Sequence, residues 1–324
     1  MMRMIIKGFF LAALMTLLCI NAYAATDTDG YTLISTPGEF IAISDELDGE
    51  YRLANDIDFT DFDFEMIVGA DTPFTGVLDG AGYSLKNITI TASNDEDLYV
   101  AVFVTNNGVI SNVVFDGVSI SAGSNKSVYA AVVAAGNSGV ITDVTVQNSS
   151  VTARTGYYAV RAAAISAYNY RLGSIDSCVS SANVKAVSRN LYSSAAGIAA
   201  VNLGKINRCI NSGSIISNAA IEYVHADGIS AEGNGSVENC ESTGEIYTGV
   251  EDILLGDVDG DGSITPTDGV VLSRYLANWT GYENSIVESA ADVDENTSID
   301  PTDGVVLSRH LAKWTGYEIL PFVG

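Results

Sequence analysis

The sequence contains the phrase Gly108-Val109-Ile110-Ser111-Asn112-Val113 and, 31 residues later, the similar phrase Gly139-Val140-Ile141-Thr142-Asp143-Val144. Three more copies of this phrase begin at Gly173, Gly204 and Gly235, and the intervals between the five glycines are 31, 34, 31 and 31 residues. Self-similarity at a period of 20–50 residues is typical of stacked repeat architectures. The phrase therefore predicts a solenoid.

Each copy contains short segments in which apolar and polar residues alternate, as in Ile141-Thr142-Asp143-Val144-Thr145-Val146. This is the period of a half-buried β-strand. One such coil cannot bury its apolar side alone, whereas coils stacked ~4.8 Å apart build a continuous core and pair every strand with the next rung. The pattern predicts a mainly β fold, a right-handed parallel β-helix over residues 25–250. An up-and-down antiparallel repeat is the main alternative.

The turns of this solenoid are predicted at asparagine and glycine, which accept the left-handed backbone that tight corners need. The asparagines that precede the glycines of the five copies are Asn106, Asn137, Asn169, Asn202 and Asn234. Ahead of the copies, Pro37–Ser44 is predicted to form a short capping helix. The region from about residue 30 to 250 resembles GLUG-type repeat proteins and other pectate-lyase-like β-helices. That resemblance implies a fold and leaves the chemistry open.

The N-terminus and the charge restrict where the protein works. Residues 1–24 are predicted to be a secretory signal peptide, since Arg3 and Lys7 precede an apolar run that ends at a small-residue site, Ala22-Tyr23-Ala24. No later stretch is apolar enough to cross a membrane, so we expect a secreted, extracellular protein. Acidic residues outnumber basic ones 40 to 15, which excludes nucleic acid as a partner because a polyanion requires Lys and Arg.

Three cysteines remain after the predicted signal peptide: Cys178, Cys209 and Cys240. They occupy the same place in successive repeats, five residues after the glycine. An odd number excludes a full disulfide framework. We expect a stack of free thiols inside the solenoid.

The function of the solenoid is less determined by its sequence. It lacks the Asn-Thr-Asp and Gly-His-Gly signatures of polygalacturonase-like β-helices, and an acid–base pair is not evident. Five tyrosines precede the same strand of successive coils: Tyr99, Tyr129, Tyr158, Tyr192 and Tyr223. A ladder of rings either contacts the sugar faces of a polysaccharide or forms only because equivalent residues lie one rung apart.

The pattern changes near residue 254, where a twelve-residue loop, 257–268, has oxygen-bearing residues at the spacing that an EF-hand-like calcium site requires. A second copy follows 35 residues later, at 292–303. The predicted ligands of the first loop are Asp257, Asp259, Asp261, Ser263 and Asp268. Those of the second loop are Asp292, Asp294, Asn296, Ser298, Asp300 and Asp303. The glycine at the bend of the first loop is replaced by Thr297 in the second, which predicts a weaker second site.

Each loop runs into a predicted amphipathic helix, with Thr265 or Asp300 as N-cap and Pro266 or Pro301 at the first helical position. This duplicated loop and helix, over residues 254–324, closely resembles a type I dockerin. The resemblance implies a small all-α EF-hand-like domain, two Ca²⁺ ions as cofactors, and a cohesin module of a scaffoldin as partner.

The two helical segments, 266–283 and 301–318, differ at only two positions. By the dockerin pattern, one copy of the cohesin-binding face contains Pro266, Thr267, Ser273 and Arg274, and the other contains Pro301, Thr302, Ser308 and Arg309. Either face is expected to suffice. The predicted function is that of a secreted cellulosome component whose β-helix contacts polysaccharide or a cell surface. The alternative is a docked β-helix enzyme, a polysaccharide lyase or a glycoside hydrolase.

Overall fold

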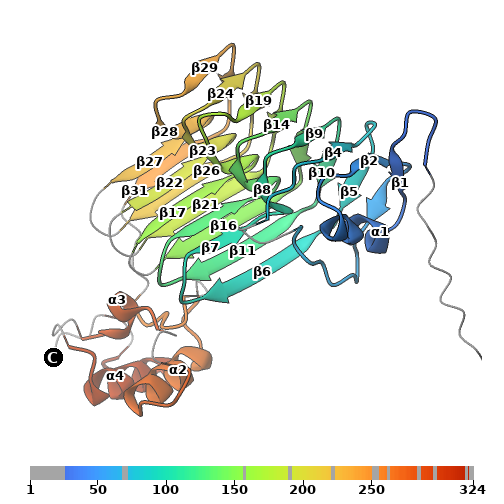
Figure 1. The fold of residues 1–324 in the computed structure, drawn as a ribbon. Helices are drawn as coiled ribbons and strands as arrows, with labels where there is room; N and C mark the ends of the chain where they lie inside the picture. The colour runs from blue at the N-terminus through green and yellow to red at the C-terminus, as the bar shows by residue number, and fades with distance from the viewer. Residues whose placement is uncertain are drawn as a thin grey trace, which may run out of the picture.

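The computed structural model describes residues 26–67, 72–155, 158–188, 192–219, 223–249, 255–260, 263–282, 286–294, 298–317 and 320. The predicted signal peptide lies outside these residues. The described chain forms a β-solenoid followed by a small helical region (Figure 1). None of the helices in the described part of the chain is long and apolar enough to cross a membrane.

The solenoid consists of five parallel sheets, to which successive coils add one strand each. The first sheet contains β1 (Thr32–Ile34), β2 (Glu50–Leu53), β4 (Val77–Asp79), β9 (Val109–Ser111), β14 (Val140–Thr142), β19 (Ser174–Asp176), β24 (Lys205–Asn207) and β29 (Ser236–Glu238). The second contains β3 (Ile57–Asp58), β5 (Ser84–Lys86), β10 (Val114–Asp116), β15 (Thr145–Gln147), β20 (Val179–Ser180), β25 (Ile210–Asn211) and β30 (Glu241–Ser242). The third contains β6 (Thr89–Asn94), β11 (Ser119–Ser124), β16 (Ser150–Thr155), β21 (Asn183–Ser188), β26 (Ile215–Ala219) and β31 (Ile246–Gly249).

The last two sheets are five-stranded. One contains β7 (Leu98–Val100), β12 (Val128–Ala131), β17 (Ala159–Ala163), β22 (Tyr192–Ala196) and β27 (Val224–Asp227). The other contains β8 (Phe103–Asn106), β13 (Ala134–Asn137), β18 (Ser166–Asn169), β23 (Ala199–Asn202) and β28 (Ser230–Gly233). The pairings between neighbouring strands of these sheets are parallel, which confirms the parallel solenoid over the antiparallel alternative. Its right-handedness stays a prediction, consistent with the preferred hand of parallel crossovers.

The repeated phrase has the predicted register. Ile110 pairs with Ile141, which pairs with Ile175, and all three are fully buried. The glycine that opens the phrase is required by close approach between coils. A Cβ added to Gly139 would lie 2.1 Å from the carbonyl oxygen of Gly108, far inside van der Waals contact.

Buried asparagines of successive coils form a hydrogen-bonded ladder, which lies at the corner before this glycine in each coil. The side-chain amide of Asn106 donates to the Oδ1 of Asn137, that of Asn137 to Asn169, and that of Asn169 to Asn202, each at 2.8 Å. Asn234 lies in the turn between β28 and β29, as predicted, but it does not extend this ladder, because the residue that pairs with Asn202 is Gly233.

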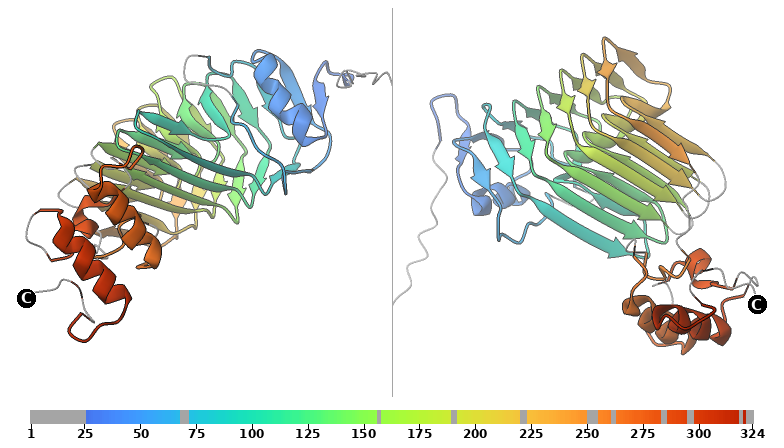
Figure 2. Two further views of the ribbon diagram at one scale, coloured as in Figure 1. Left: turned by 90° about the horizontal axis from the view of Figure 1, so that it is seen from below. Right: turned by 180° about the vertical axis from the view of Figure 1, so that it is seen from behind.

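The predicted capping helix is present as α1 (Pro37–Ile41) followed by a 3₁₀ turn, Ala42–Asp45. Thr36 and Glu39 form a capping box at its start. Phe40 is fully buried and meets Phe59 and Phe103 edge-on, with ring centroids 5.7 and 6.1 Å apart. Phe40 thus covers the N-terminal end of the apolar core, and Figure 2 shows α1 at that end of the solenoid.

The three cysteines lie on successive rungs as free thiols. Cys178 and Cys209 are buried, and burial raises the pKa of the Cys178 thiol well above its usual value. Cys240 is only half-buried, so the prediction of three buried thiols is wrong for the last one. The reason is that Cys240 lies in the final coil, whose strands β29 and β30 are exposed.

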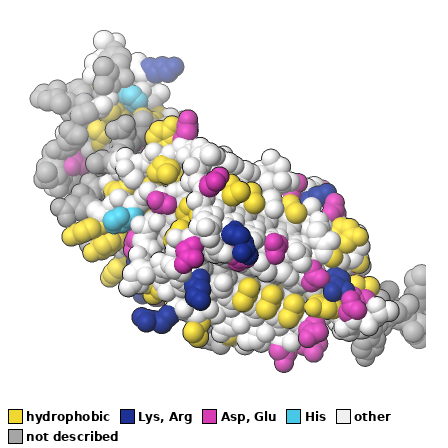
Figure 3. Space-filling view, turned by 90° about the horizontal axis from the view of Figure 1, so that it is seen from above, with side chains coloured by type: hydrophobic (Ala, Val, Ile, Leu, Met, Phe, Trp, Pro, Cys, Tyr) yellow, Lys and Arg dark blue, Asp and Glu magenta, His cyan; other side chains and the backbone are white. Residues whose placement is uncertain are grey.

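Acidic and basic side chains are interspersed among hydrophobic ones on the face drawn in Figure 3. Several carboxylates of the solenoid are held by neighbouring coils. Asp56 pairs with Lys86 at 2.6 Å, and Asp58 accepts hydrogen bonds from Asn87 and Thr60. These contacts lower the pKa of Asp58 to about 2, with the hydrogen bond from Asn87 as the largest cause.

The helical region contains α2 (Pro266–Leu276), α3 (Glu288–Ala291) and α4 (Pro301–Leu311). It has its own apolar core, separate from that of the solenoid. The buried members of this core are Val258, Leu272, Ile286, Ala291, Val293, Val306 and Leu307. Among the described residues of this region the buried core is small, and small cores bury less apolar surface per residue than large ones.

Candidate calcium and partner-binding site

The first predicted calcium loop brings three carboxylates together. Asp257, Asp259 and Asp268 each offer a ligand oxygen within 4.8 Å of the others. They occupy positions 1, 3 and 12 of the loop, which are the positions from which an EF-hand-like loop supplies carboxylates. The predicted ligand Asp261 lies outside the described residues.

The second loop repeats this arrangement with Asp292, Asp294 and Asp303, whose ligand oxygens also lie within 4.8 Å of one another. The predicted ligand Asn296 and the bend residue Thr297 lie outside the described residues. Among the residues that the structure describes, these are the two groups of three such side chains close enough to share an ion. Convergent hard oxygens of this kind fit calcium.

The last carboxylate of each loop is fully buried and holds the loop in place. Asp268 accepts hydrogen bonds from the backbone N–H groups of Asp259 and Thr265, at 3.0 and 2.7 Å. Asp303 accepts them from Val293 and Asp300, both at 2.8 Å. In each loop, one carboxylate at the start of the helix thus holds a residue near the beginning of the loop and the residue that caps the helix.

Burial raises the pKa of Asp303, and the nearby charge of Asp294 acts in the same direction. Both effects disfavour the charged form of the carboxyl group. A buried carboxylate close to a second negative charge is destabilising unless a cation compensates it.

Asp300 has a different position from the three clustered carboxylates of its loop. Its Oδ1 accepts the backbone N–H of Thr302 at 2.6 Å, which makes it the N-cap of α4 and lowers its pKa. Position 9 of an EF-hand-like loop often reaches the ion through water, so the cap is compatible with the predicted role. The roles of Ser263 and Ser298 as carbonyl ligands stay predictions.

Both helices begin at the residues that the sequence predicted. Thr265 caps α2 and Asp300 caps α4, each in a capping box, with Pro266 and Pro301 at the first helical position. Because the box partners are Asp268 and Asp303, the residue that ends each loop also begins each helix. Loop and helix are therefore one structural unit.

The two helices pack against each other in a symmetric way. Gly269 of α2 faces Leu311 of α4, and Gly304 of α4 faces Leu276 of α2; a Cβ on either glycine would lie 3.4 Å from the leucine methyl. The internal duplication of the sequence is thus repeated in space, and each helix presents an equivalent outer surface.

Most of the predicted cohesin-binding residues lie on these outer surfaces. The exposed ones are Pro266, Thr267, Ser273, Pro301, Thr302 and Ser308. The sequence did not single out Val270 and Val305, which are 46% exposed. Val270 lies three residues after Thr267 and three before Ser273, so it shares their helix face. Each face therefore has an apolar centre.

Arg274 and Arg309 pack against aromatic rings of their own helical segments. The guanidinium of Arg274 packs over the rings of Trp279 and Tyr282, 5.3 and 5.1 Å from their centroids, and donates a hydrogen bond to the Tyr282 hydroxyl. Arg309 makes the same contacts with Trp314 and Tyr317. Both arginines are half-buried, so they support the face as well as contribute to it.

The exposed aromatic members of these clusters were missed by the sequence analysis. Trp279 and Trp314 are 56% and 57% exposed. The signal was present, because Trp279-Thr280-Gly281-Tyr282 recurs unchanged as Trp314-Thr315-Gly316-Tyr317. Exposed tryptophan beside arginine is a combination enriched in the centres of protein interfaces.

The predicted ladder of five tyrosines on the solenoid is wrong in part. Tyr99 and Tyr129 are stacked, with ring centroids 4.6 Å apart, and Tyr192 and Tyr223 form a second stack at 4.8 Å. Tyr158 belongs to neither. The register pairs Tyr129 with Arg161, three residues after Tyr158, because that coil is longer than the one before it.

Comparison with known proteins agrees with both parts of the chain. Residues 255–312 match the family described as "Dockerin type I domain". The chain is similar to a crystal structure from Bacteroides ovatus described as a "putative immunoglobulin A1 protease", with 16% identity and a TM-score of 0.50, covering 69% of this chain and 78% of that chain. Identity this low supports the fold alone. No curated protein sequence matches the chain.

Proposed function

We propose, from the dockerin type I domain at residues 255–312, that this protein is a secreted component of a cellulosome-type complex. In this proposal two calcium ions order the loops 257–268 and 292–303. The helices that follow then bind a cohesin module of a scaffoldin, and the β-solenoid is the module so attached. Type I dockerins are cohesin-binding and calcium-binding domains.

The observation that carries the proposal is the duplicated cluster of carboxylates. Each cluster joins a buried aspartate at the start of a helix to two aspartates earlier in its loop. Because like charges at this distance repel, the loop is stable only when a cation joins them. The same aspartate begins the helix, so ion binding would also order the partner-binding face.

The solenoid is proposed to contact polysaccharide or a cell surface without changing it chemically. Among its described outer residues, stacked tyrosines and half-buried polar groups are the features that suit such a contact. The predicted signal peptide, residues 1–24, would deliver the protein to the extracellular space or the cell surface.

Titration of the full chain with a panel of type I cohesin modules tests the docking proposal. We expect a calorimetric signal with at least one cohesin in calcium and none in chelator. Asp257→Ala combined with Asp292→Ala should abolish it, whereas Asp95→Ala on the solenoid should leave it unchanged. Calcium-independent binding would contradict the proposal.

A further inference from the structure

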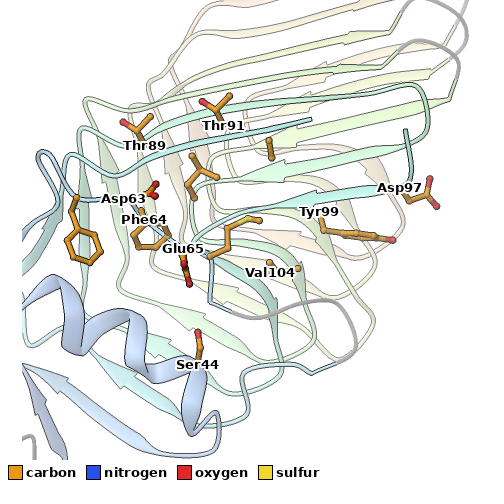
Figure 4. Close-up of a pocket in the computed structure, with 13 residues that line it drawn as sticks. Ser44, Asp63, Phe64, Glu65, Thr89, Thr91, Asp97, Tyr99 and Val104 are labelled. Atoms are coloured by element: carbon orange, nitrogen blue, oxygen red, sulfur yellow. The ribbon is translucent and has the colours of Figure 1, made fainter. Parts of the chain in front are cut away.

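A groove of about 930 Å³ lies at the N-terminal end of the solenoid, along β6 and β7, the terminal strands of their sheets. Its described walls come from the segment Phe62–Met66, from strand β6 and from Asp97 and Tyr99, with Val104 as a further contact (Figure 4). This volume lies within the range of pockets that bind small molecules or segments of a polymer.

The groove combines apolar surfaces with oxygen-bearing groups. Phe62, Met66 and Tyr99 are half-buried and provide the apolar surfaces. The polar side chains are exposed, and they comprise three carboxylates and three hydroxyls: Asp63, Glu65, Asp97, Ser44, Thr89 and Thr91. The described lining contains no lysine or arginine.

Tyr99 connects the groove to an aromatic strip. One face of its ring is covered by Tyr129, at 4.6 Å and within 4° of parallel. Beyond Tyr129 follow Tyr168 and Tyr170, whose rings lie 4.6 Å apart. Tyr99 is the first ring of this strip and also lines the groove, so it joins the two features.

Among the described residues of the strip, the basic group is Arg161, and it is paired with a carboxylate. Arg161 lies over the Tyr129 ring, 5.4 Å from its centroid, and its Nη1 donates to the Tyr129 hydroxyl at 3.4 Å. Its Nη2 lies 4.0 Å from the Oε2 of Glu232. The groove and strip together therefore have a surplus of negative charge.

We propose that this groove binds a neutral glycan chain, with Tyr99 as the stacking platform. This rests on the part of the proposed function that gives the solenoid a polysaccharide-contacting role. A pyranose ring has an apolar C–H face that matches an aromatic ring, and a rim of hydroxyls that donate to carboxylates and exchange hydrogen bonds with threonine. Both complements are present in the groove.

The charge of the groove selects against other glycans. An acidic polysaccharide would bring its carboxylates against Asp63, Glu65 and Asp97 with no basic residue among the described lining to compensate. A calcium ion would not bridge them as a cluster, because within the described residues only the two dockerin loops bring three carboxylates within ligand distance.

A basic peptide would also find negative charge in the groove. It would not need the aromatic platform, and its binding would weaken steeply with salt, since it depends on ion pairs. A neutral glycan held by stacking and hydrogen bonds should bind nearly equally at 50 and 300 mM NaCl. This difference separates the two ligands experimentally.

Affinity electrophoresis of the full chain tests the proposal with defined probes. The neutral probes are hydroxyethylcellulose, xyloglucan and galactomannan, and the charged ones are polygalacturonate, glycol chitosan and oligolysine. We expect retardation by at least one neutral polymer, insensitive to salt. Tyr99→Ala should weaken that retardation at least tenfold, and Tyr99→Phe, which keeps the ring, should preserve it.

Tyr247→Ala is the matched control, because Tyr247 is 52% exposed on β31 of the last coil and belongs to neither tyrosine stack. It should leave glycan binding unchanged, and thermal unfolding should show that every variant is folded. No retardation by any neutral polymer, or retardation that Tyr99→Ala does not weaken, would overturn the proposal. So would stronger binding of a charged probe through Tyr99. Repeating the assay in chelator separates this proposal from cohesin docking, since glycan binding should persist when docking is lost.

Discussion

The solenoid and the dockerin domain are both built by repetition, yet they solve the problem of internal polar groups in opposite ways. Inside the solenoid, polar groups satisfy one another: the amides of Asn106, Asn137, Asn169 and Asn202 form a continuous ladder. Inside the dockerin domain, two fully buried aspartates, Asp268 and Asp303, lie beside further carboxylates. The asparagine ladder is closed by the polypeptide itself, whereas the proposed function gives the clustered carboxylates a calcium ion as their partner.

The size of this difference follows from elementary electrostatics. Two unit charges 4.8 Å apart repel by roughly 3 kcal/mol at an effective dielectric constant of 20. Each loop contains three such pairs, and the small apolar core of the domain offers little to offset them. A divalent cation reverses the sign of this energy, so its presence should decide whether the domain folds.

The largest expected effect is therefore that of chelation, which should affect one region only. In excess chelator we expect the helical signal of residues 255–320 to disappear and the solenoid strands to remain, as reported by hydrogen exchange resolved along the chain. Rapid exchange in α2 and α4 alone, reversed by calcium, is the predicted pattern. If α2 and α4 stay protected without calcium, the contrast between the regions is wrong.

The converse change should damage only the solenoid. Phe40→Ala removes a fully buried ring that covers the end of the core, so we expect about 3–5 kcal/mol of destabilisation of the solenoid. Differential scanning calorimetry in calcium should show the solenoid transition lowered and the dockerin transition unmoved. Tyr247→Ala, at an exposed position of the last coil, is the control and should change neither.

A smaller effect distinguishes the two halves of the dockerin domain. Asn278 and Lys313 occupy equivalent positions after α2 and α4, both with left-handed backbone, at φ of 51° and 54°. Asparagine tolerates this conformation better than lysine does. Lys313→Gly should therefore stabilise the calcium-loaded domain by about 1 kcal/mol, and Asn278→Gly by less. Equal gains, measured by thermal unfolding, would contradict this account of the difference.

In the solenoid, a pH effect is expected at Asp58. Hydrogen bonds from Asn87 and Thr60 lower the pKa of Asp58 to about 2. A lowered carboxyl pKa contributes stability above its unfolded value, near 4, and that contribution is lost as the pH falls toward 2. The solenoid of the Asp58→Asn variant should thus be less stable than the unmodified one at pH 6, by a small margin that vanishes near pH 2. A margin that does not depend on pH would contradict the assignment.

The sequence predicted the repetitive parts of the molecule better than their irregularities. Five copies of one phrase determined the coil, its strands and the inward position of Ile110 and Ile141, because stacking forces equivalent residues into register. The register failed where a coil changes length, which placed Arg161 and not Tyr158 next to Tyr129. The longer coil was visible as the 34-residue interval between Gly139 and Gly173, but the interval does not show where in the coil the extra residues lie.

The candidate sites likewise differ in how well the sequence predicted them. The calcium ligands follow from spacing within one short loop, so the clusters around Asp268 and Asp303 were predictable. The groove beside Tyr99 was not predictable, because its walls come from residues 44, 62–66, 89–92, 97, 99 and 104, which the coil brings together. The packing of Arg274 against Trp279 was likewise hidden, although the duplicated Trp-Thr-Gly-Tyr was a visible signal.

The central claim is that the dockerin domain presents two equivalent faces, either of which is sufficient for binding. Calorimetric titration of single-face and double-face variants with one matching cohesin tests it most directly. Because Arg274 and Arg309 support the local packing, the faces are better disabled at exposed positions: Val270→Asp with Ser273→Asp, and Val305→Asp with Ser308→Asp.

Loss of one of two equal binding modes costs RT ln 2, about 0.4 kcal/mol of binding free energy. We predict that each pair alone weakens binding by about twofold and that the four substitutions together abolish it. Loss of binding with either pair alone, while the domain remains folded in calcium, would show that a single face binds and would contradict the account.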